Sequence, residues 1–244
     1  LAVQVLPLTN PLRVAEEAAT VDHISKGRFD FGVGRSGLTK YYQGYNIPYS
    51  ESRTRFMESL DIIMKAWKEG KFSHQGEYHS FEDVTVVPKP YQKPHPPTRI
   101  AVAGEDTFPL IGKLGYPIFI GVNTPTPQLQ ERLKSYRKGR LEAGHAGPDD
   151  VALRIPVYVA ETAEKARSEP EASARHAIQY ASTELATTAA SQETADRLRR
   201  IASTPYEEIL EKRVMFGTPE AVLERLQEYQ ETLGISGVVL EMNY

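Results

Sequence analysis

The sequence contains no cysteine. This absence excludes disulfide bridges, catalytic thiolates, iron–sulfur clusters and cysteine-ligated zinc together, and it agrees with a location in the cytoplasm. The six histidines are the remaining metal-ligand candidates, and none pairs with a nearby acid at the i, i+4 spacing of a helical metal site. We therefore expect no metal site.

Long apolar runs and an excess of charge of one sign are also missing. No run approaches the roughly 20 apolar residues of a membrane span, and no signal peptide is visible. The net charge is −3, and acidic and basic residues are interspersed. We therefore expect neither a nucleic-acid-binding face nor a membrane anchor. The chain has 244 residues, 40% of them hydrophobic, which is enough for one domain with a sizeable core.

Strand-like and helix-like segments alternate along the chain, which is typical of a mostly parallel sheet. Asn10-Pro11 predicts the start of a helix that ends at Gly27. A second helix is predicted over 50–70, with one apolar stripe formed by Phe56, Leu60, Ile63 and Trp67. Six core strands are expected to begin near Leu1, Phe29, Arg99, Pro117, Leu153 and Val238. A doubly wound sheet and a (β/α)8 barrel both fit this count.

The whole chain, residues 1–244, is expected to form a single domain. Residues 72–97 alternate strand-like pieces with turns and predict a hairpin excursion. Residues 181–205 are helical in pattern but polar and rich in alanine, which makes them a candidate mobile lid. The chain starts inside one strand-like segment and stops directly after another. Both ends therefore look like cuts through a larger fold, and a barrel would need two more strands upstream of Leu1.

The stretch GVGRSG, residues 32–37, matches the dinucleotide-binding pattern G-x-G-x-x-G. That fingerprint needs a helix that opens directly on its last glycine. Here residues 38–50 follow, with Gly44 and Pro48 among them and no helical period. The context therefore argues against a dinucleotide site. Arg35 is the more informative residue, because it follows the carboxyl end of a predicted parallel strand, where α/β folds place their ligands.

Arg53 is predicted to lie on the core-facing stripe of the second helix, in its first turn. The amino end of that helix and the carboxyl end of the preceding strand meet at the same mouth of the fold, so we expect Arg35 and Arg53 to converge there. Two guanidinium groups beside a helix start make a good site for a phosphate dianion. The segment AGEDT, residues 103–107, opens a further helix and offers backbone N–H groups, although it also carries two acids.

Three tyrosines, Tyr41, Tyr42 and Tyr45, follow Arg35. They either shape an apolar substrate wall or pack the loop in which they lie.

With these residues in view, the sequence resembles the bacterial-luciferase-like flavin monooxygenase family. The resemblance rests on residues 6–37, on Ser52-Arg53, on PKPYQKPHPPTRIAVAG at 88–104 and on FGTPEAV at 216–222. It runs over essentially the whole chain and implies a (β/α)8 barrel that lacks its first strands and its last helix in this chain. It also implies a site for FMN, usually reduced, or for the deazaflavin F420, at the carboxyl ends of the strands.

The resemblance also implies roles for individual residues. Arg35 and Arg53 match the side chains that contact the flavin phosphate. Ala103, Gly104 and Glu105, with Thr107 just beyond, match the segment whose backbone meets the phosphate and ribityl chain. Ala2 and Val3 match a non-prolyl cis peptide against the flavin ring. Glu105 stands where bacterial luciferase has a serine, and the catalytic residues of the family match positions upstream of Leu1.

Three functions follow from this resemblance. The first is a monooxygenase that uses reduced FMN, supplied by a separate flavin reductase, and O₂ to oxygenate a small aldehyde- or ketone-like substrate. The second is an F420-dependent oxidoreductase that transfers hydride on the same barrel. The third is a flavin-binding protein without catalytic activity. The family also implies a homodimer.

Overall fold

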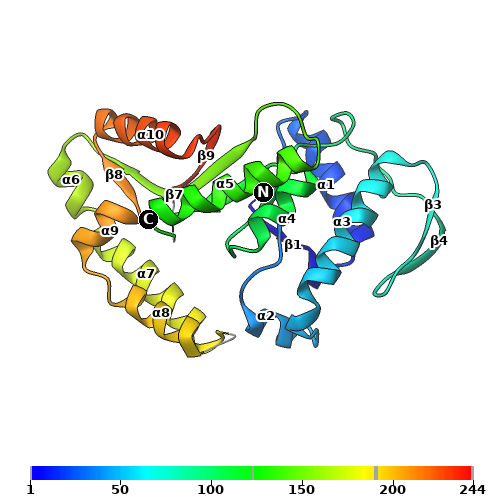
Figure 1. Ribbon diagram of the computed structural model, residues 1–244, viewed down its shortest axis with the longest axis horizontal. Helices are drawn as coiled ribbons and strands as arrows, with labels where there is room; N and C mark the ends of the chain where they lie inside the picture. The colour runs from blue at the N-terminus through cyan, green and yellow to red at the C-terminus, as the bar shows by residue number, and fades with distance from the viewer. Residues whose placement is uncertain (1, 123, 190–191, 243–244) are drawn as a thin grey trace. The chain divides into compact units, whose positions relative to one another are not determined.

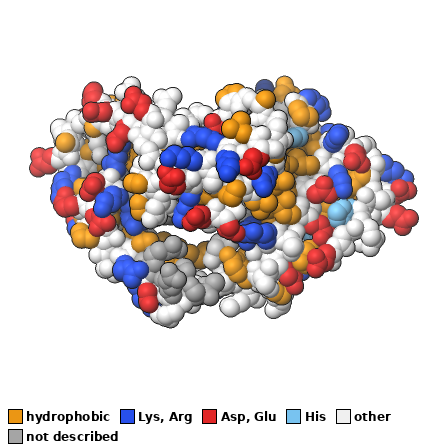
Figure 2. All heavy atoms as spheres, viewed as in Figure 1, with side chains coloured by type: hydrophobic (Ala, Val, Ile, Leu, Met, Phe, Trp, Pro, Cys, Tyr) orange, Lys and Arg blue, Asp and Glu red, His pale blue; other side chains and the backbone are white. Residues whose placement is uncertain are grey.

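The computed structural model describes residues 2–122, 124–189 and 192–242 of the chain (Figure 1). These residues form two compact units, Leu1–Ala101 and Val102–Tyr244. On the face shown in Figure 2, basic and acidic side chains are interspersed. None of the helices in the described ranges combines the length and the apolar character needed to cross a membrane.

The first unit contains three parallel strands with helices between them. Its elements are β1 (Gln4–Val5), η1 (Leu6–Leu8), α1 (Pro11–Ser25), β2 (Phe31–Gly34), α2 (Thr39–Gly44), η2 (Tyr49–Glu51), α3 (Ser52–Lys68), β3 (Phe72–Gln75), β4 (Ser80–Val84) and β5 (Thr98–Ala101). Strand β2 lies between β1 and β5, with Val33 opposite both Gln4 and Ile100. All four residues of β2 are buried, so the strand forms the centre of this unit.

Local sequence signals account for α1. The Asn10 side-chain oxygen accepts hydrogen bonds from the backbone N–H groups of Leu12 and Arg13, at 3.0 and 3.4 Å. Pro11 occupies the first helical turn, where its missing N–H costs nothing. The left-handed conformation that ends the helix begins at Lys26, with φ 55°, and continues at Gly27, with φ 78°. The helix therefore ends at Ser25, and its cap is Lys26, one residue before the predicted glycine cap.

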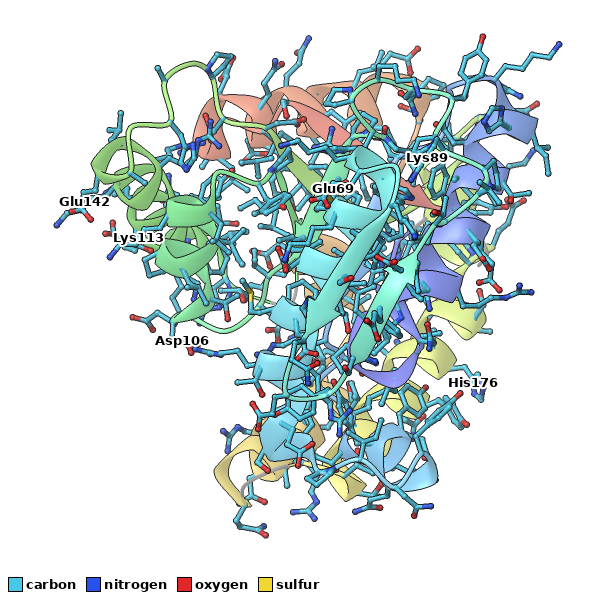
Figure 3. The ribbon with its side chains drawn as sticks, turned by 90° about the vertical axis from the view of Figure 1, so that its right-hand side faces the viewer. Glu69, Lys89, Asp106, Lys113, Glu142 and His176 are labelled. Atoms are coloured by element: carbon cyan, nitrogen blue, oxygen red, sulfur yellow. The ribbon has the colours of Figure 1, made fainter. Side chains whose placement is uncertain are left out.

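The apolar stripe of α3 is buried as predicted, with Phe56, Leu60, Ile63 and Trp67 between 0 and 4% exposed. Full burial of such a side chain contributes about 1.5–3 kcal/mol. The Trp67 indole N–H also donates to the carbonyl oxygen of Ala15 at 3.0 Å, which joins α3 to α1. The end of α3 is closed by Lys89, whose ammonium group donates to the carbonyls of Ala66 and Glu69 (Figure 3).

The structure tests the predictions made for residues 72–97 and for the segment after Gly37. The hairpin excursion is confirmed, because β3 and β4 form a separate antiparallel pair. The expectation of an irregular segment after Gly37 is wrong, because α2 forms within it. The reason is the burial of Tyr42, which is 1% exposed. One deeply packed side chain stabilises a short helix that shows no apolar period.

The second unit is built around one long strand. Its elements are α4 (Thr107–Leu114), β6 (Ile118–Gly121), α5 (Thr126–Glu142), β7 (Val151–Val159), α6 (Ala163–Ser168), α7 (Glu171–Thr187), α8 (Gln192–Ala202), α9 (Tyr206–Lys212), β8 (Met215–Gly217), α10 (Pro219–Leu233) and β9 (Gly237–Glu241). Strand β7 pairs in parallel with β6, with β9 and, over its last three residues, with β8. Strand β8 is not among the predicted strands, because its three residues are too few to show a period.

The candidate lid, residues 181–205, includes the end of α7 and all of α8, which pack against each other. Residues 190–191 lie outside the described part of the chain. The mobility of this segment stays a prediction.

Candidate functional site

Arg35 is held at the first turn of α3. It directly follows Gly34, the last residue of β2, and its side chain is half-buried. Its Nη1 donates a hydrogen bond of 3.1 Å to the hydroxyl oxygen of Ser52, the first residue of α3. Ser52 is 3% exposed. The carboxyl end of β2 and the amino end of α3 therefore meet, as the sequence analysis predicts.

Arg53 does not lie on the buried stripe of α3, and this expectation is wrong. Its side chain is exposed, and the buried residue of the first turn is Ser52. The stripe continues from Phe56 back by four residues to Ser52 rather than by three to Arg53. One residue along a helix turns the side chain by about 100°, so Arg53 points to solvent beside the residue that holds Arg35.

The peptide bond between Ala2 and Val3 is cis, as the resemblance implies. Val3 lies against the end of β2, because a Cβ placed on Gly34 would come within 3.0 Å of the Val3 Cγ2. Any side chain at position 34 would force Val3 to move. Within the first unit, Val3 therefore lies against the residue that precedes Arg35.

The remaining predicted residues belong to the second unit. Ala103, Gly104 and Glu105 are exposed, and Thr107 begins α4 and is half-buried. The Thr107 N–H donates to the carbonyl of Gly104 at 3.0 Å, which closes a turn at the start of the helix. The exposed side chain of Glu105 faces solvent, and Asp106 lies directly before α4 (Figure 3).

Beside this segment of the second unit lies an arginine that the sequence pattern does not predict. Arg132, on α5, donates from Nη1 to the carbonyl of Ala103 at 2.9 Å and to the Thr124 hydroxyl at 3.0 Å. It therefore places a positive charge beside the segment that carries Glu105 and Asp106. No local signal marks Arg132, because its partner Ala103 lies 29 residues away.

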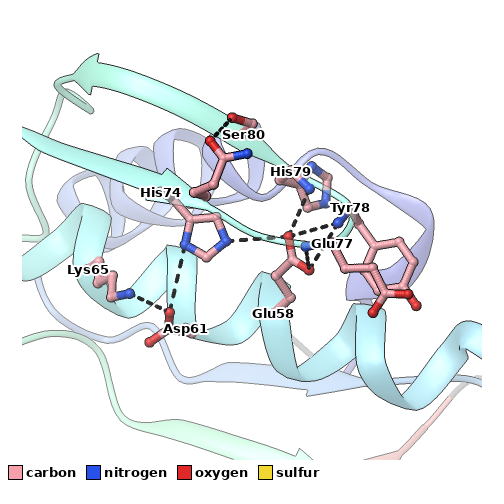
Figure 4. A network of polar contacts seen from close by, with 9 residues as sticks. Glu58, Asp61, Lys65, His74, Glu77, Tyr78, His79 and Ser80 are labelled. Carbon is pink, nitrogen blue, oxygen red and sulfur yellow. Dashed lines mark hydrogen bonds and ion pairs between the residues drawn. The ribbon is translucent and has the colours of Figure 1, made fainter.

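A separate polar network lies between α3 and the β3–β4 hairpin (Figure 4). The Glu58 carboxylate accepts hydrogen bonds from the backbone N–H groups of Glu77, Tyr78 and His79, at 3.1, 3.1 and 2.8 Å. The His74 Nε2 lies 3.4 Å from the same carboxylate. Burial raises the pKa of Glu58, but the hydrogen bonds outweigh it, and the pKa lies below its usual value of 4.5.

This network anchors the hairpin rather than forming a reactive centre. The backbone donors occupy the oxygens of Glu58, so the carboxylate has little capacity for a metal or a substrate. Across the described residues, no group of three or more histidine, aspartate or glutamate side chains is arranged to hold a metal ion.

A cavity of about 700 Å³ lies in the second unit, between the start of α5 and the helices α9 and α10. Leu129, Leu153, Arg213, Arg225 and Tyr229 are among its lining residues. Arg225 already donates to the carbonyls of Leu210 and Glu211 at the end of α9. None of the residues predicted for the flavin site lines this cavity.

The sequence profile of the luciferase-like monooxygenase family matches residues 1–235, which is nearly the entire chain. The chain belongs to the luciferase-like monooxygenase family. Among curated relatives, the alkanal monooxygenase alpha chain of the Kryptophanaron alfredi symbiont is 30% identical over 144 residues, which cover 59% of this chain and 40% of the relative. The oxygenase component of a flavin-dependent trigonelline monooxygenase from Acinetobacter baylyi is 35% identical over 100 residues, which cover 40% and 27%.

Solved structures confirm the predicted fold, a luciferase-like (β/α)8 barrel. The monooxygenase RslO1 from Streptomyces bottropensis superposes with a TM-score of 0.79 and 26% identity, over 98% of this chain and 69% of RslO1. The oxygenating constituent of 3,6-diketocamphane monooxygenase from Pseudomonas putida, in complex with FMN, gives 0.78 and 18%, over 98% and 71%. An F420-dependent secondary alcohol dehydrogenase gives 0.73 and 17%, over 95% and 69%.

The match spans only part of the curated relatives. It covers 29, 34 and 40% of the length of three of them. These matches therefore do not establish the activity, substrate or partners of the whole protein, which we propose below.

Proposed function

We propose that this protein is an FMN-dependent monooxygenase. It uses reduced FMN and O₂ to oxygenate a small aldehyde- or ketone-like substrate. The observation that carries the proposal is the position of Arg35, whose half-buried guanidinium is held by Ser52 at the first turn of α3. A guanidinium at a helix start presents forked donors and a favourable dipole to a phosphate, and the terminal group of FMN is a phosphate.

The donor set fits this cofactor. Arg35 binds the phosphate from the end of β2, and Arg53 adds a second positive charge from α3. The resemblance assigns the backbone of residues 103–105 and Thr107 to the phosphate and ribityl chain, and Ala2 and Val3 to the ring. Reduced flavin supplies the electrons for oxygen activation when it is bound. The chain's own residues grip the phosphate, orient the ring and exclude water.

The names of relatives support the cofactor and the partner. The Acinetobacter relative is described as the oxygenase component of a flavin-dependent monooxygenase, which implies a separate reductase as the source of reduced flavin. The Pseudomonas structure is a Baeyer–Villiger monooxygenase in complex with FMN. We propose the same division of labour here, in a cytoplasmic homodimer.

An F420-dependent oxidoreductase is the second candidate, because an F420-dependent alcohol dehydrogenase shares the fold. The extended anionic tail of F420 favours a wider basic mouth than two arginines provide. A flavin-binding protein without turnover is the third candidate. An assay for oxygenation of a carbonyl substrate distinguishes it from the first, because only the monooxygenase forms an oxygenated product.

Anaerobic titration of the purified protein with reduced FMN, reduced riboflavin and reduced F420 tests these functions. We expect tight binding of FMN and weak binding of riboflavin, because only FMN carries the phosphate. Arg35→Ala and Arg53→Ala are each expected to weaken FMN binding by about 1.5–3 kcal/mol and to leave riboflavin binding unchanged. Arg28→Ala is the matched control, because this exposed arginine precedes β2 at its opposite end. Wild-type affinity for FMN in both site variants contradicts the assignment, and preference for F420 moves it to hydride transfer.

A further inference from the structure

We propose that Tyr42 and Ser52 are positioning residues that hold Arg35 ready to bind the cofactor phosphate, Tyr42 through the Arg35 backbone and Ser52 through its side chain. This inference rests on the proposed function, because it assigns Arg35 to the phosphate. It adds two residues that make no contact with the cofactor themselves. It also predicts a specific effect on binding, one that depends on the phosphate.

The Tyr42 hydroxyl donates a hydrogen bond to the backbone carbonyl of Arg35. Tyr42 is 1% exposed, the most deeply buried of the three tyrosines after Arg35, whereas Tyr41 and Tyr45 are 52 and 64% exposed. A buried phenol hydroxyl needs a partner to offset its lost hydration. Burial raises the pKa of Tyr42 to about 12, so the hydroxyl remains a proton donor at physiological pH. Tyr42 therefore packs the loop rather than lining a substrate wall.

The segment between Arg35 and α2 has little packing of its own. Ser36 adopts a left-handed conformation with φ 62°, and its hydroxyl accepts the Leu38 N–H at 3.1 Å. Gly37 is exposed, and a Cβ placed there would find no atom within 4 Å. The contact from Tyr42 therefore ties this loosely packed segment back to the end of β2.

Tyr42 and Ser52 are themselves connected through η2. The rings of Tyr42 and Tyr49 pack edge to face, with centroids 5.1 Å apart and an interplanar angle of 89°. The Ser52 N–H donates to the Tyr49 carbonyl, and the Ser52 hydroxyl accepts from Arg35 at 3.1 Å. The contacts form a closed ring from the Arg35 carbonyl through Tyr42, Tyr49 and Ser52 to the Arg35 guanidinium.

A closed ring of contacts fixes both ends of the arginine before the phosphate arrives. An arginine side chain loses rotamer freedom when it is immobilised on binding, which reduces affinity. Here the folded protein has already restricted the backbone and the guanidinium. Loss of either contact releases Arg35 without removing its charge, so binding of the phosphate weakens while contacts to the flavin ring persist.

The test compares binding of reduced FMN and reduced riboflavin under anaerobic conditions, in Tyr42→Phe, Ser52→Ala and Arg35→Ala. Tyr42→Phe keeps the ring and removes only the hydroxyl. We expect each positioning variant to weaken FMN binding by about threefold to tenfold and to change riboflavin binding by less than about twofold. Tyr91→Phe, which removes the hydroxyl of an exposed tyrosine in the same unit, is the control. A role in folding alone weakens both ligands equally.

The outcomes separate the inference from the proposed function. Loss of FMN affinity in Arg35→Ala together with wild-type affinity in Tyr42→Phe and Ser52→Ala overturns the inference and leaves the function intact. Equal weakening of both ligands in the positioning variants also overturns it. Wild-type FMN affinity in Arg35→Ala overturns the phosphate assignment itself. If Tyr42→Phe folds poorly, Ser52→Ala alone tests the inference through the same comparison of FMN affinity with riboflavin affinity.

Discussion

Replacement of Glu58 by glutamine should release the β3–β4 hairpin from α3. Glutamine keeps the size of the side chain but has one oxygen in place of two, so at least one backbone N–H in the turn at 77–79 loses its acceptor. The Glu58 side chain is 11% exposed, so water does not readily replace the lost bond. Hydrogen bonds to a charged group contribute about 1.5–3 kcal/mol, and we expect a loss of about 2–3 kcal/mol at neutral pH.

Amide hydrogen exchange is the suitable assay, because it reports local opening of the hairpin rather than unfolding of the whole chain. A loss of 2–3 kcal/mol corresponds to a fall in protection of about 30- to 150-fold at the amides of Tyr78 and His79. Glu77→Gln is the control, because it removes the same charge from an exposed position on the same hairpin. Wild-type protection at these amides in Glu58→Gln would refute the anchoring role.

The pH dependence provides a second check. The pKa of Glu58 in the folded protein lies below its usual value of 4.5. The anchoring contribution is therefore complete above pH 4.5 and is lost as the pH falls through the lowered pKa. Protection of the hairpin in the wild-type protein should decrease in acid, whereas Glu58→Gln should lack this step. Parallel acid profiles of the two proteins would contradict the assignment.

Two further predictions concern packing and a buried carboxylate. Gly112→Ala should destabilise the contact between α4 and α5 by about 1–3 kcal/mol, because the new Cβ would lie 2.2 Å from the backbone oxygen of Tyr136. Thermal unfolding measures this loss, with Gly121→Ala as the control, because a Cβ added at Gly121 would have no atom within 4 Å. Equal melting temperatures of the two variants would contradict the prediction. Asp22→Ala should loosen residues 88–97, because the fully buried Asp22 carboxylate accepts hydrogen bonds from the backbone and side-chain N–H groups of Gln92, both at 2.8 Å. Limited proteolysis within 88–97 is expected to be faster in the variant. An unchanged cleavage rate would count against this role of Asp22.

Several features of the protein follow from residues close together in the sequence. The alternation of strands and helices, the Asn10 cap and the buried stripe of α3 depend on spacings of two to four residues. The position of Arg35 at the end of a buried strand has the same origin. The sequence alone therefore predicts an α/β fold with a mostly parallel sheet and an arginine at the carboxyl ends of its strands, and the resemblance adds the barrel and the flavin.

Other features depend on tertiary contacts that no local spacing of residue types shows. Ser52 rather than Arg53 faces inward, because the packing of the stripe on α1 sets the rotation of α3. Helix α2 forms around Tyr42, whose partner Arg35 lies seven residues earlier, and Arg132 reaches Ala103 across 29 residues. Periodicity cannot show such pairs, because it reports only which face of an element is apolar. The tertiary structure alone decides which polar groups those faces bring together.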